Sequence, residues 1–250
     1  MLGLLVIIVV SWALLYFIAN KNIEVLGIVP TGKRIIQFII GIVVIMPISL
    51  LNIYIETIVL NIEWELQSSI NYQIVFDAFV YHLRSALTED LVFRGAILYI
   101  LINRLGVNWG ISISALCFGV YHVFSYGMIE AGIISILYVI LITGFMGYVW
   151  AYTFHKTKSI MLGLGFHVGV NLCNTFFFKS QPYGELILKA INKIQLADWS
   201  WLGFNLFKGL FPAIMILLFV KLVFRKDLNL LKRKNPKVLC IYHDCDVNTK

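Results

Sequence analysis

Three ionisable residues, Glu89, Asp90 and Arg94, lie in the middle of a mostly apolar stretch at residues 83–102, which has a fourth ionisable residue, Arg84, at its start. A charge at the centre of a membrane helix costs roughly +2.5 to +3.5 kcal/mol, whereas each Leu, Ile, Phe or Val returns only about −0.3 to −0.6 kcal/mol. Three charges therefore cost about 8–10 kcal/mol, and the apolar neighbours supply about half of that. This stretch is expected to face a protein cavity on one side, and its polar residues are candidates for a functional site.

Helical geometry separates the roles of these three residues. Residues four apart lie on one face of a helix, so Asp90 and Arg94 are expected to form an ion pair. That pair leaves Glu89 as the unpaired acid, about 100° further round the helix. A carboxylate in this position could take a proton from a water molecule, as a general base does.

Two later apolar segments each carry a histidine with a partner four residues away. Phe118 precedes His122, and its ring is expected to pack against the imidazole. His167 and Asn171 share a helix face in the same way, and Asn174 continues that face. An acid, two imidazoles and an amide on three helices suit water activation: His122 would orient the water, and His167 with Asn171 would donate to an oxyanion.

The same side chains could instead bind a divalent metal. Glu89, His122 and His167 supply two imidazoles and a carboxylate, a common set of zinc ligands in hydrolases that keep one position open. The sequence leaves open whether the reactive water is bound to a metal such as zinc or is free of metal.

The three motifs, in this order on three apolar segments, resemble those of the CPBP family, the CAAX-protease and bacteriocin-processing proteins that are also called the Abi family. The chain has Glu-Asp-x-x-x-Arg, Phe-x-x-x-His and His-x-x-x-Asn within residues 85–175. The family's usual first motif has two glutamates, so Asp90 stands in place of the second one. We interpret this change as tolerated, because Asp90 keeps the charge that pairs with Arg94.

The resemblance implies an intramembrane endopeptidase that cleaves a membrane-associated peptide or protein, which is prenylated in the case of the eukaryotic members. The catalytic acid, histidines and amide of the family correspond here to Glu89, His122, His167 and Asn171. Supporting roles then fall to Asp90, Arg94 and Phe118. Members have been described both as metalloproteases and as glutamate-dependent proteases, so the resemblance leaves the cofactor open.

The composition is that of a membrane protein. Hydrophobic residues make up 60% of the chain and charged residues 13%, and the mean hydropathy is +0.87. We therefore predict an all-α, polytopic transmembrane helical bundle. The net charge of +7 does not indicate a nucleic-acid partner, because Lys and Arg lie in short loops and in the tail. Near the C-terminus, Cys240, His243 and Cys245 are interpreted as part of a solvated tail and not as a metal site.

About seven spans are predicted, at residues 2–19, 35–60, 83–102, 109–126, 129–154, 159–178 and 199–223. The mixed segment 61–82 contains Trp64 and Tyr72 among acidic residues, which is typical of an interfacial helix. The loop charges place the N-terminus outside and the basic tail, residues 225–250, in the cytoplasm. We therefore expect one protease domain at residues 1–224, embedded in the cell membrane, whose partners are lipid and a membrane-associated substrate.

Two other functions fit the same residues. A non-catalytic bacteriocin-immunity or membrane interaction protein would use the polar cluster for binding alone. A transporter would use it as an ion pathway, but the chain shows no paired broken helices in corresponding halves. Each motif by itself is better explained by structure, as an ion pair, a hydrogen-bonded histidine or an interhelical amide contact. Their joint occurrence favours a shared site.

Overall fold

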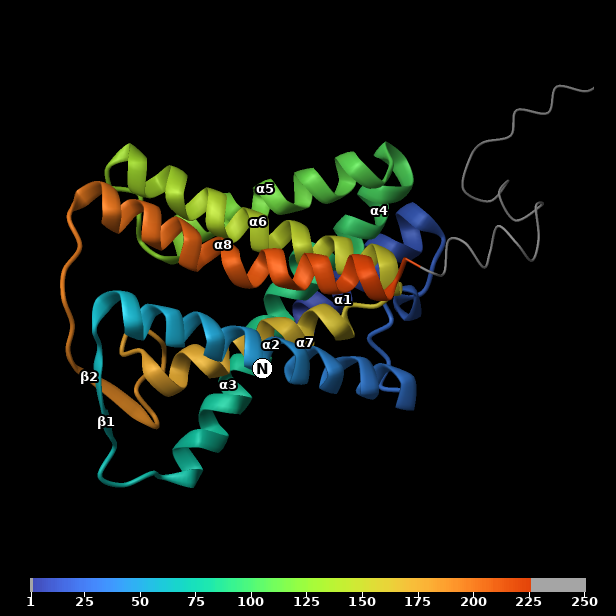
Figure 1. Cartoon of the computed structure of the whole chain (residues 1–250). Helices are drawn as coiled ribbons and strands as arrows, with labels where there is room; N and C mark the ends of the chain where they lie inside the picture. The colour runs from blue at the N-terminus through green and yellow to red at the C-terminus, as the bar shows by residue number, and fades with distance from the viewer. Residues whose placement is uncertain (1, 226–250) are drawn as a thin grey trace, which may run out of the picture.

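The structure is a computed structural model that describes residues 2–225. These residues form eight α-helices, one 3-10 turn and two short strands (Figure 1). In chain order they are α1 (Leu2–Ala19), the turn Ile23–Leu26, α2 (Gly32–Leu60), β1 (Glu63–Leu66), α3 (Tyr72–Arg94), α4 (Ala96–Leu105), α5 (Val107–Ser125), α6 (Ile133–Thr157), α7 (Met161–Phe177), β2 (Leu188–Asn192) and α8 (Asp198–Val223). The predicted helical bundle is confirmed. The predicted basic tail, with Cys240, His243 and Cys245, lies outside the described residues from position 226 onward.

Five of the described helices are long and apolar enough to cross a membrane, namely α1, α2, α5, α6 and α8. The chain is therefore a multi-pass membrane protein, but five such helices are fewer than the seven predicted spans. The sixth predicted span corresponds to α7, which is apolar but only 17 residues long. A helix that crosses the bilayer alone needs about 20 residues.

The third predicted span, at residues 83–102, is wrong as a single helix. It is divided between the end of α3 and the start of α4, and Gly95 between them has φ −85° and ψ −131°, outside the helical region. A Cβ atom on Gly95 would clash with the carbonyl oxygen of Leu91. One glycine in an apolar run is compatible with a continuous helix, so the sequence pattern did not reveal this break.

The interfacial helix predicted at residues 61–82 is also wrong over its first part. Strand β1 pairs there with β2 in an antiparallel ribbon, with Trp64 opposite Ala190. Helix α3 then begins at Tyr72, where the Asn71 side chain accepts hydrogen bonds from backbone N–H groups of the first turn. The partner strand lies far along the chain, so local periodicity could not predict the pairing.

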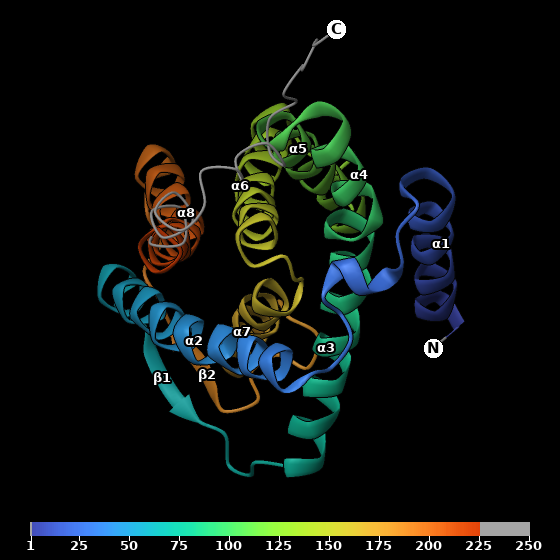
Figure 2. The same ribbon diagram turned by 90° about the vertical axis from the view of Figure 1, so that its right-hand side faces the viewer.

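Helix α7 lies at the centre of the bundle, between α2, α3 and α6 (Figure 2). It packs most extensively against α2, and the two backbones meet at glycines. A Cβ atom on Gly41 would lie 2.8 Å from the Cα atom of Gly165, and a Cβ atom on Gly165 would clash with the carbonyl oxygen of Phe38. Such close approach is what small residues permit between membrane helices. The helix that carries His167 is therefore held firmly against α2.

Candidate active site

Glu89 of α3 lies between the imidazoles of α5 and α7. Its Oε2 atom is 3.9 Å from Nε2 of His122 and 3.7 Å from Nε2 of His167. The three side chains are 18%, 8% and 12% exposed, respectively. Glu89 Oε2 has no hydrogen-bond partner among the described residues. Because buried polar atoms are nearly always paired, this oxygen and the two ring nitrogens outline a position for a small polar species such as water.

His122 is oriented by its own helix. Its Nδ1 atom lies 2.8 Å from the backbone carbonyl oxygen of Phe118. A carbonyl oxygen only accepts, so Nδ1 carries the proton and Nε2 faces Glu89 with its lone pair. The Phe118 ring meets the imidazole edge-on at a centroid distance of 4.3 Å, which confirms the expected contact. The rings of Tyr121 and Tyr126 enclose it further, at 5.2 and 5.0 Å.

His167 lies between two carboxylates. Its Nε2 atom faces Glu89, and its Nδ1 atom is 3.5 Å from Oδ1 of Asp90. That distance is at the long end for a hydrogen bond, so a small closure would let Nδ1–H donate to Asp90. The Trp150 ring packs edge-on against the imidazole at 5.9 Å. Sequence reasoning assigned Asp90 to Arg94 alone and did not predict this second contact.

The predicted ion pair on α3 is confirmed. Arg94 Nη1 lies 3.1 Å from Asp90 Oδ1, and both side chains are 2% exposed. The guanidinium carbon sits 3.7 Å from the centroid of the Phe118 ring. Gly147 of α6 leaves room for this stack, since a Cβ atom there would be 2.9 Å from Cδ1 of Phe118 and 3.2 Å from Nη2 of Arg94. Arg94 is linked through Asp90 to His167.

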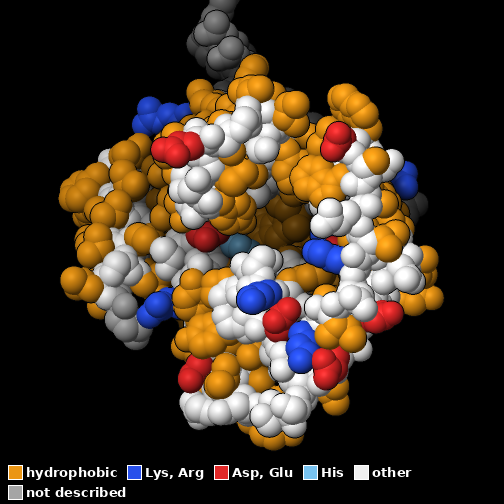
Figure 3. Space-filling view, turned by 90° about the vertical axis from the view of Figure 1, so that its left-hand side faces the viewer, with side chains coloured by type: hydrophobic (Ala, Val, Ile, Leu, Met, Phe, Trp, Pro, Cys, Tyr) orange, Lys and Arg blue, Asp and Glu red, His pale blue; other side chains and the backbone are white. Residues whose placement is uncertain are grey.

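A cavity of about 350 Å³ is lined by residues of α2, α5, α6, α7 and α8, and both histidines are part of its wall. Figure 3 shows a deep hollow in the corresponding face of the molecule, with a histidine and an acidic side chain visible inside it. Asn171 and Asn174 line the same cavity, as the spacing along α7 predicted. The cavity therefore brings together the imidazoles and the amide, while the oxyanion role of Asn171 stays a prediction.

The part of the chain that carries these residues matches a known family. Residues 71–173 match the family model described as type II CAAX prenyl endopeptidase Rce1-like. The match covers 103 of the 250 residues, and we call this part of the chain the Rce1-like domain. The Rce1-like segment begins next to α3 and ends within α7, so it includes Glu89 and both histidines. It confirms the resemblance to the CAAX-protease family and supports an intramembrane CAAX-type endopeptidase at the level of the family. No curated protein and no solved structure matches the chain significantly.

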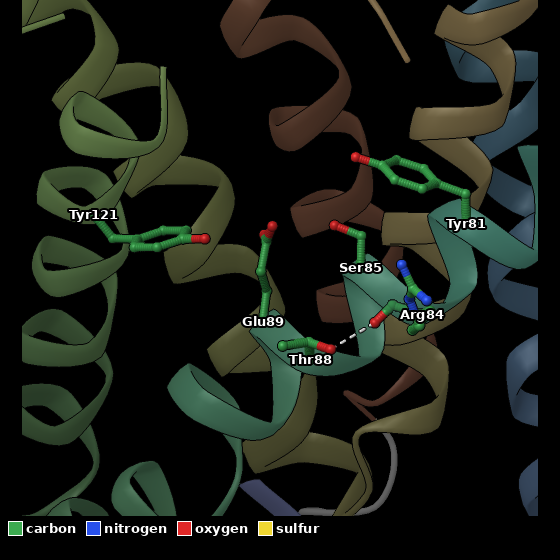
Figure 4. Close-up of a pocket in the computed structure, with 6 residues that line it drawn as sticks. All are labelled: Tyr81, Arg84, Ser85, Thr88, Glu89 and Tyr121. Atoms are coloured by element: carbon green, nitrogen blue, oxygen red, sulfur yellow. Dashed lines mark hydrogen bonds between the residues drawn. The ribbon is translucent and has the colours of Figure 1, made fainter. Parts of the chain in front are cut away.

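A second pocket, of about 230 Å³, adjoins Glu89 within the Rce1-like domain. Its lining residues are Tyr81, Arg84, Ser85, Thr88, Glu89 and Tyr121. Figure 4 shows the Glu89 carboxylate projecting between Tyr121 and Ser85. Neither Tyr121 nor Ser85 was selected from the sequence. Ser85 precedes Glu89 by one helical turn, so the i,i+4 rule could have found it. Tyr121 comes from α5, and no pattern in the sequence places it beside Glu89.

The donor types in the Rce1-like site suit a zinc ion, but their spacing does not. Zinc ligands in a tetrahedral site with bonds of about 2.0 Å are separated from each other by about 3.3 Å. The Glu89 oxygen is 3.7 and 3.9 Å from the two ring nitrogens. Within residues 2–225, no group of three or more His, Cys, Asp or Glu side chains is arranged to hold a metal ion. The metal site considered at Glu89, His122 and His167 is therefore not supported by this geometry.

His82 of α3 is buried at 3% exposure. Its Nε2 atom lies 2.8 Å from the hydroxyl oxygen of Thr175 and 3.3 Å from the carbonyl oxygen of Pro182. These contacts tie α3 of the Rce1-like domain to the end of α7. These contacts give the buried His82 a structural role.

Proposed function

We propose that this protein is an intramembrane endopeptidase that hydrolyses a peptide bond in a membrane-associated substrate. The substrate class is a peptide or protein held at the bilayer by an apolar group such as a prenyl chain. One observation carries the proposal: a single oxygen of Glu89 lies within 4 Å of the Nε2 atoms of both His122 and His167, inside an Rce1-like domain.

In the proposed reaction, a water molecule lies between Glu89 and His122. Nε2 of His122 accepts a hydrogen bond from one O–H of the water and so orients it. Glu89 Oε2 takes the other proton while the water oxygen attacks the carbonyl carbon of the peptide bond. The carbonyl electron pair moves to its oxygen, which gives a tetrahedral oxyanion.

His167 and Asn171 stabilise that oxyanion. We assign His167 its doubly protonated form in this step, so that Nδ1–H donates to Asp90 and Nε2–H donates to the developing charge. The Asn171 side-chain amide supplies a second donor from the same face of α7. Collapse of the intermediate breaks the C–N bond, and Glu89 returns its proton to the leaving amine. The products are a carboxylic acid and an amine, and Glu89 is regenerated.

The orientation of the two histidines depends on the Asp90–Arg94 pair. Asp90 contacts Nδ1 of His167, on the side of the ring opposite Glu89. Arg94 stacks on the ring of Phe118, and the backbone carbonyl oxygen of Phe118 accepts a hydrogen bond from His122. The pair is a positioning element and does not itself take part in proton transfer.

Replacement of His122 by Ala is expected to lower the rate of peptide cleavage by about 10²–10⁴-fold, because the attacking water loses its orienting acceptor. The measurement uses purified protein in nanodiscs and an internally quenched peptide with a farnesylated C-a-a-X sequence. His155→Ala is the matched control, since His155 lines neither pocket. A non-catalytic immunity or interaction protein would instead keep its cellular effect when His122 and His167 are both replaced by Ala.

Chelators are expected to leave the cleavage rate unchanged, because no proposed step passes through a metal. The test incubates the protein with 1,10-phenanthroline before the peptide is added, and repeats the assay after zinc is returned. If the chelator abolishes cleavage and added zinc restores it, the reactive water is bound to a metal, and the two imidazoles are metal ligands.

A further inference from the structure

The cavity that contains the two histidines also contains a second polar cluster, formed by α2 and α8. Lys208 of α8 donates to Glu56 of α2, with 2.8 Å between Nζ and Oε1. Asn52 lies one helical turn before Glu56 and lines the same cavity. All three residues lie outside the Rce1-like segment 71–173. Buried ionisable residues in membrane helices are functional candidates by default, and the proposed reaction uses none of these.

A proline in α8 determines how Asn52 is oriented. The carbonyl oxygen of Lys208 would ordinarily accept a hydrogen bond from the backbone N–H of residue 212, but Pro212 has none. Instead, Nδ2 of Asn52 donates to this oxygen at 3.0 Å. The amide nitrogen of Asn52 is thereby occupied by α8. Its Oδ1 atom is buried and has no partner within residues 2–225.

The cluster therefore contains an unpaired hydrogen-bond acceptor on Asn52 and further hydrogen-bond donors on Lys208. Asn52 Oδ1 is the unpaired acceptor. The Lys208 ammonium has three N–H groups, of which one is directed to Glu56. The Lys208 ammonium also lies 5.6 Å from the centroid of the Phe178 ring, and the side chain is 30% exposed and lines the cavity.

We propose that Asn52 and Lys208 form a subsite for one extended residue of the substrate main chain, whose N–H donates to Asn52 Oδ1 and whose C=O accepts from Lys208 Nζ. Each residue carries one main-chain donor and one main-chain acceptor, and in an extended chain both point to the same side, which is the complement of this pair. A carboxylate fits less well, because Glu56 already balances the charge of Lys208 and Asn52 Oδ1 would face a second acceptor. This inference rests on the proposed function, since it takes the ligand of the cavity to be a peptide.

The position of the subsite agrees with an extended substrate. The same cavity is lined by His122 and His167, by Asn52 and by Lys208. Its volume of about 350 Å³ is in the range of ordinary ligand pockets. A peptide whose scissile bond lies beside Glu89 would therefore continue toward α2 and α8, and the subsite would set its register.

The test measures binding, so that it does not depend on cleavage. Glu89→Ala protein in nanodiscs is titrated with a fluorescent farnesylated C-a-a-X peptide and with analogues that are N-methylated at one amide each. N-methylation of one particular amide is expected to weaken binding about tenfold, because Asn52 then loses its donor. The same analogue should lose no further affinity when Asn52→Leu is added. Asn205→Leu is the matched control, since Asn205 belongs to α8 but lines neither pocket.

A second variant keeps Asn52 and its bond to α8. Glu56→Gln combined with Lys208→Met removes both charges together, and it is expected to raise the Kd of every peptide about tenfold while the N-methyl effect persists. This variant also serves if Asn52→Leu does not fold. The subsite is overturned if neither variant changes binding, if N-methylation acts equally with and without Asn52, or if the Lys208 effect vanishes when the peptide ends in a carboxamide. Failure of the intact protein to cleave, with this binding pattern present, would remove the proposed function and leave the subsite standing.

Discussion

Replacement of Glu89 by Ala is expected to reduce peptide cleavage toward the upper end of the roughly 10²–10⁴-fold range for loss of a general base. The effect should be large because this carboxylate serves twice, first when it takes the proton of the water and then when it returns it to the leaving amine. The rate is measured on the farnesylated C-a-a-X peptide with protein in nanodiscs. Stability should not fall, because removal of a largely buried carboxylate that has no full hydrogen-bond complement also removes its desolvation cost.

The matched control for this experiment is Asp77→Asn, which removes an exposed carboxylate from the same helix, α3. It should cleave at the rate of the unchanged protein. In cells, a comparison of membrane peptides between the unchanged protein and Glu89→Ala would identify the natural substrate as the species that accumulates uncut. Cleavage at the full rate by Glu89→Ala would remove the mechanism.

Replacement of Arg94 by Met is expected to cost about 3–5 kcal/mol of folding free energy, because it leaves the charge of Asp90 buried without its partner. Both side chains are 2% exposed, so solvent cannot take the place of the guanidinium. The stack of Arg94 on Phe118 is lost as well. The quantity to measure is the free energy of unfolding in detergent, followed by proteolysis or by a denaturant titration.

The double variant Asp90→Asn with Arg94→Met should recover most of that stability, since replacing both members of a buried ion pair is often close to neutral. Cleavage should be low in the double variant, because Asp90→Asn removes the carboxylate at the Nδ1 atom of His167. Lys189→Met is the surface control: Lys189 pairs with Glu65 at 2.9 Å, but the side chains are 41% and 54% exposed. Exposed pairs contribute about 0–1 kcal/mol. An Arg94→Met protein as stable as the unchanged one would show that Asp90 is not charged in the folded state.

The polar residues of the Rce1-like domain could be selected from the order of the amino acids alone, because helix geometry relates residues four apart. The Asp90–Arg94 ion pair and the contact of Phe118 with His122 are both relations of this kind, and both are present. Hydropathy likewise located most helices, since the bilayer requires long apolar segments. The limits of α1 agree with the predicted first span. These features depend on neighbours within one or two turns, so the sequence by itself determined them.

Features that depend on contacts between distant segments were decided only by the tertiary structure. The sequence did not show that the third predicted span breaks at Gly95, or that β1 pairs with β2. It also did not show that Asp90 faces His167 or that Lys208 meets Glu56, because the partners lie on different helices. Periodicity states which face of a helix a residue occupies, and it carries no information on which helix covers that face. The packing of α7 against α2 and α3 supplies that information, and it places one carboxylate oxygen between two imidazoles.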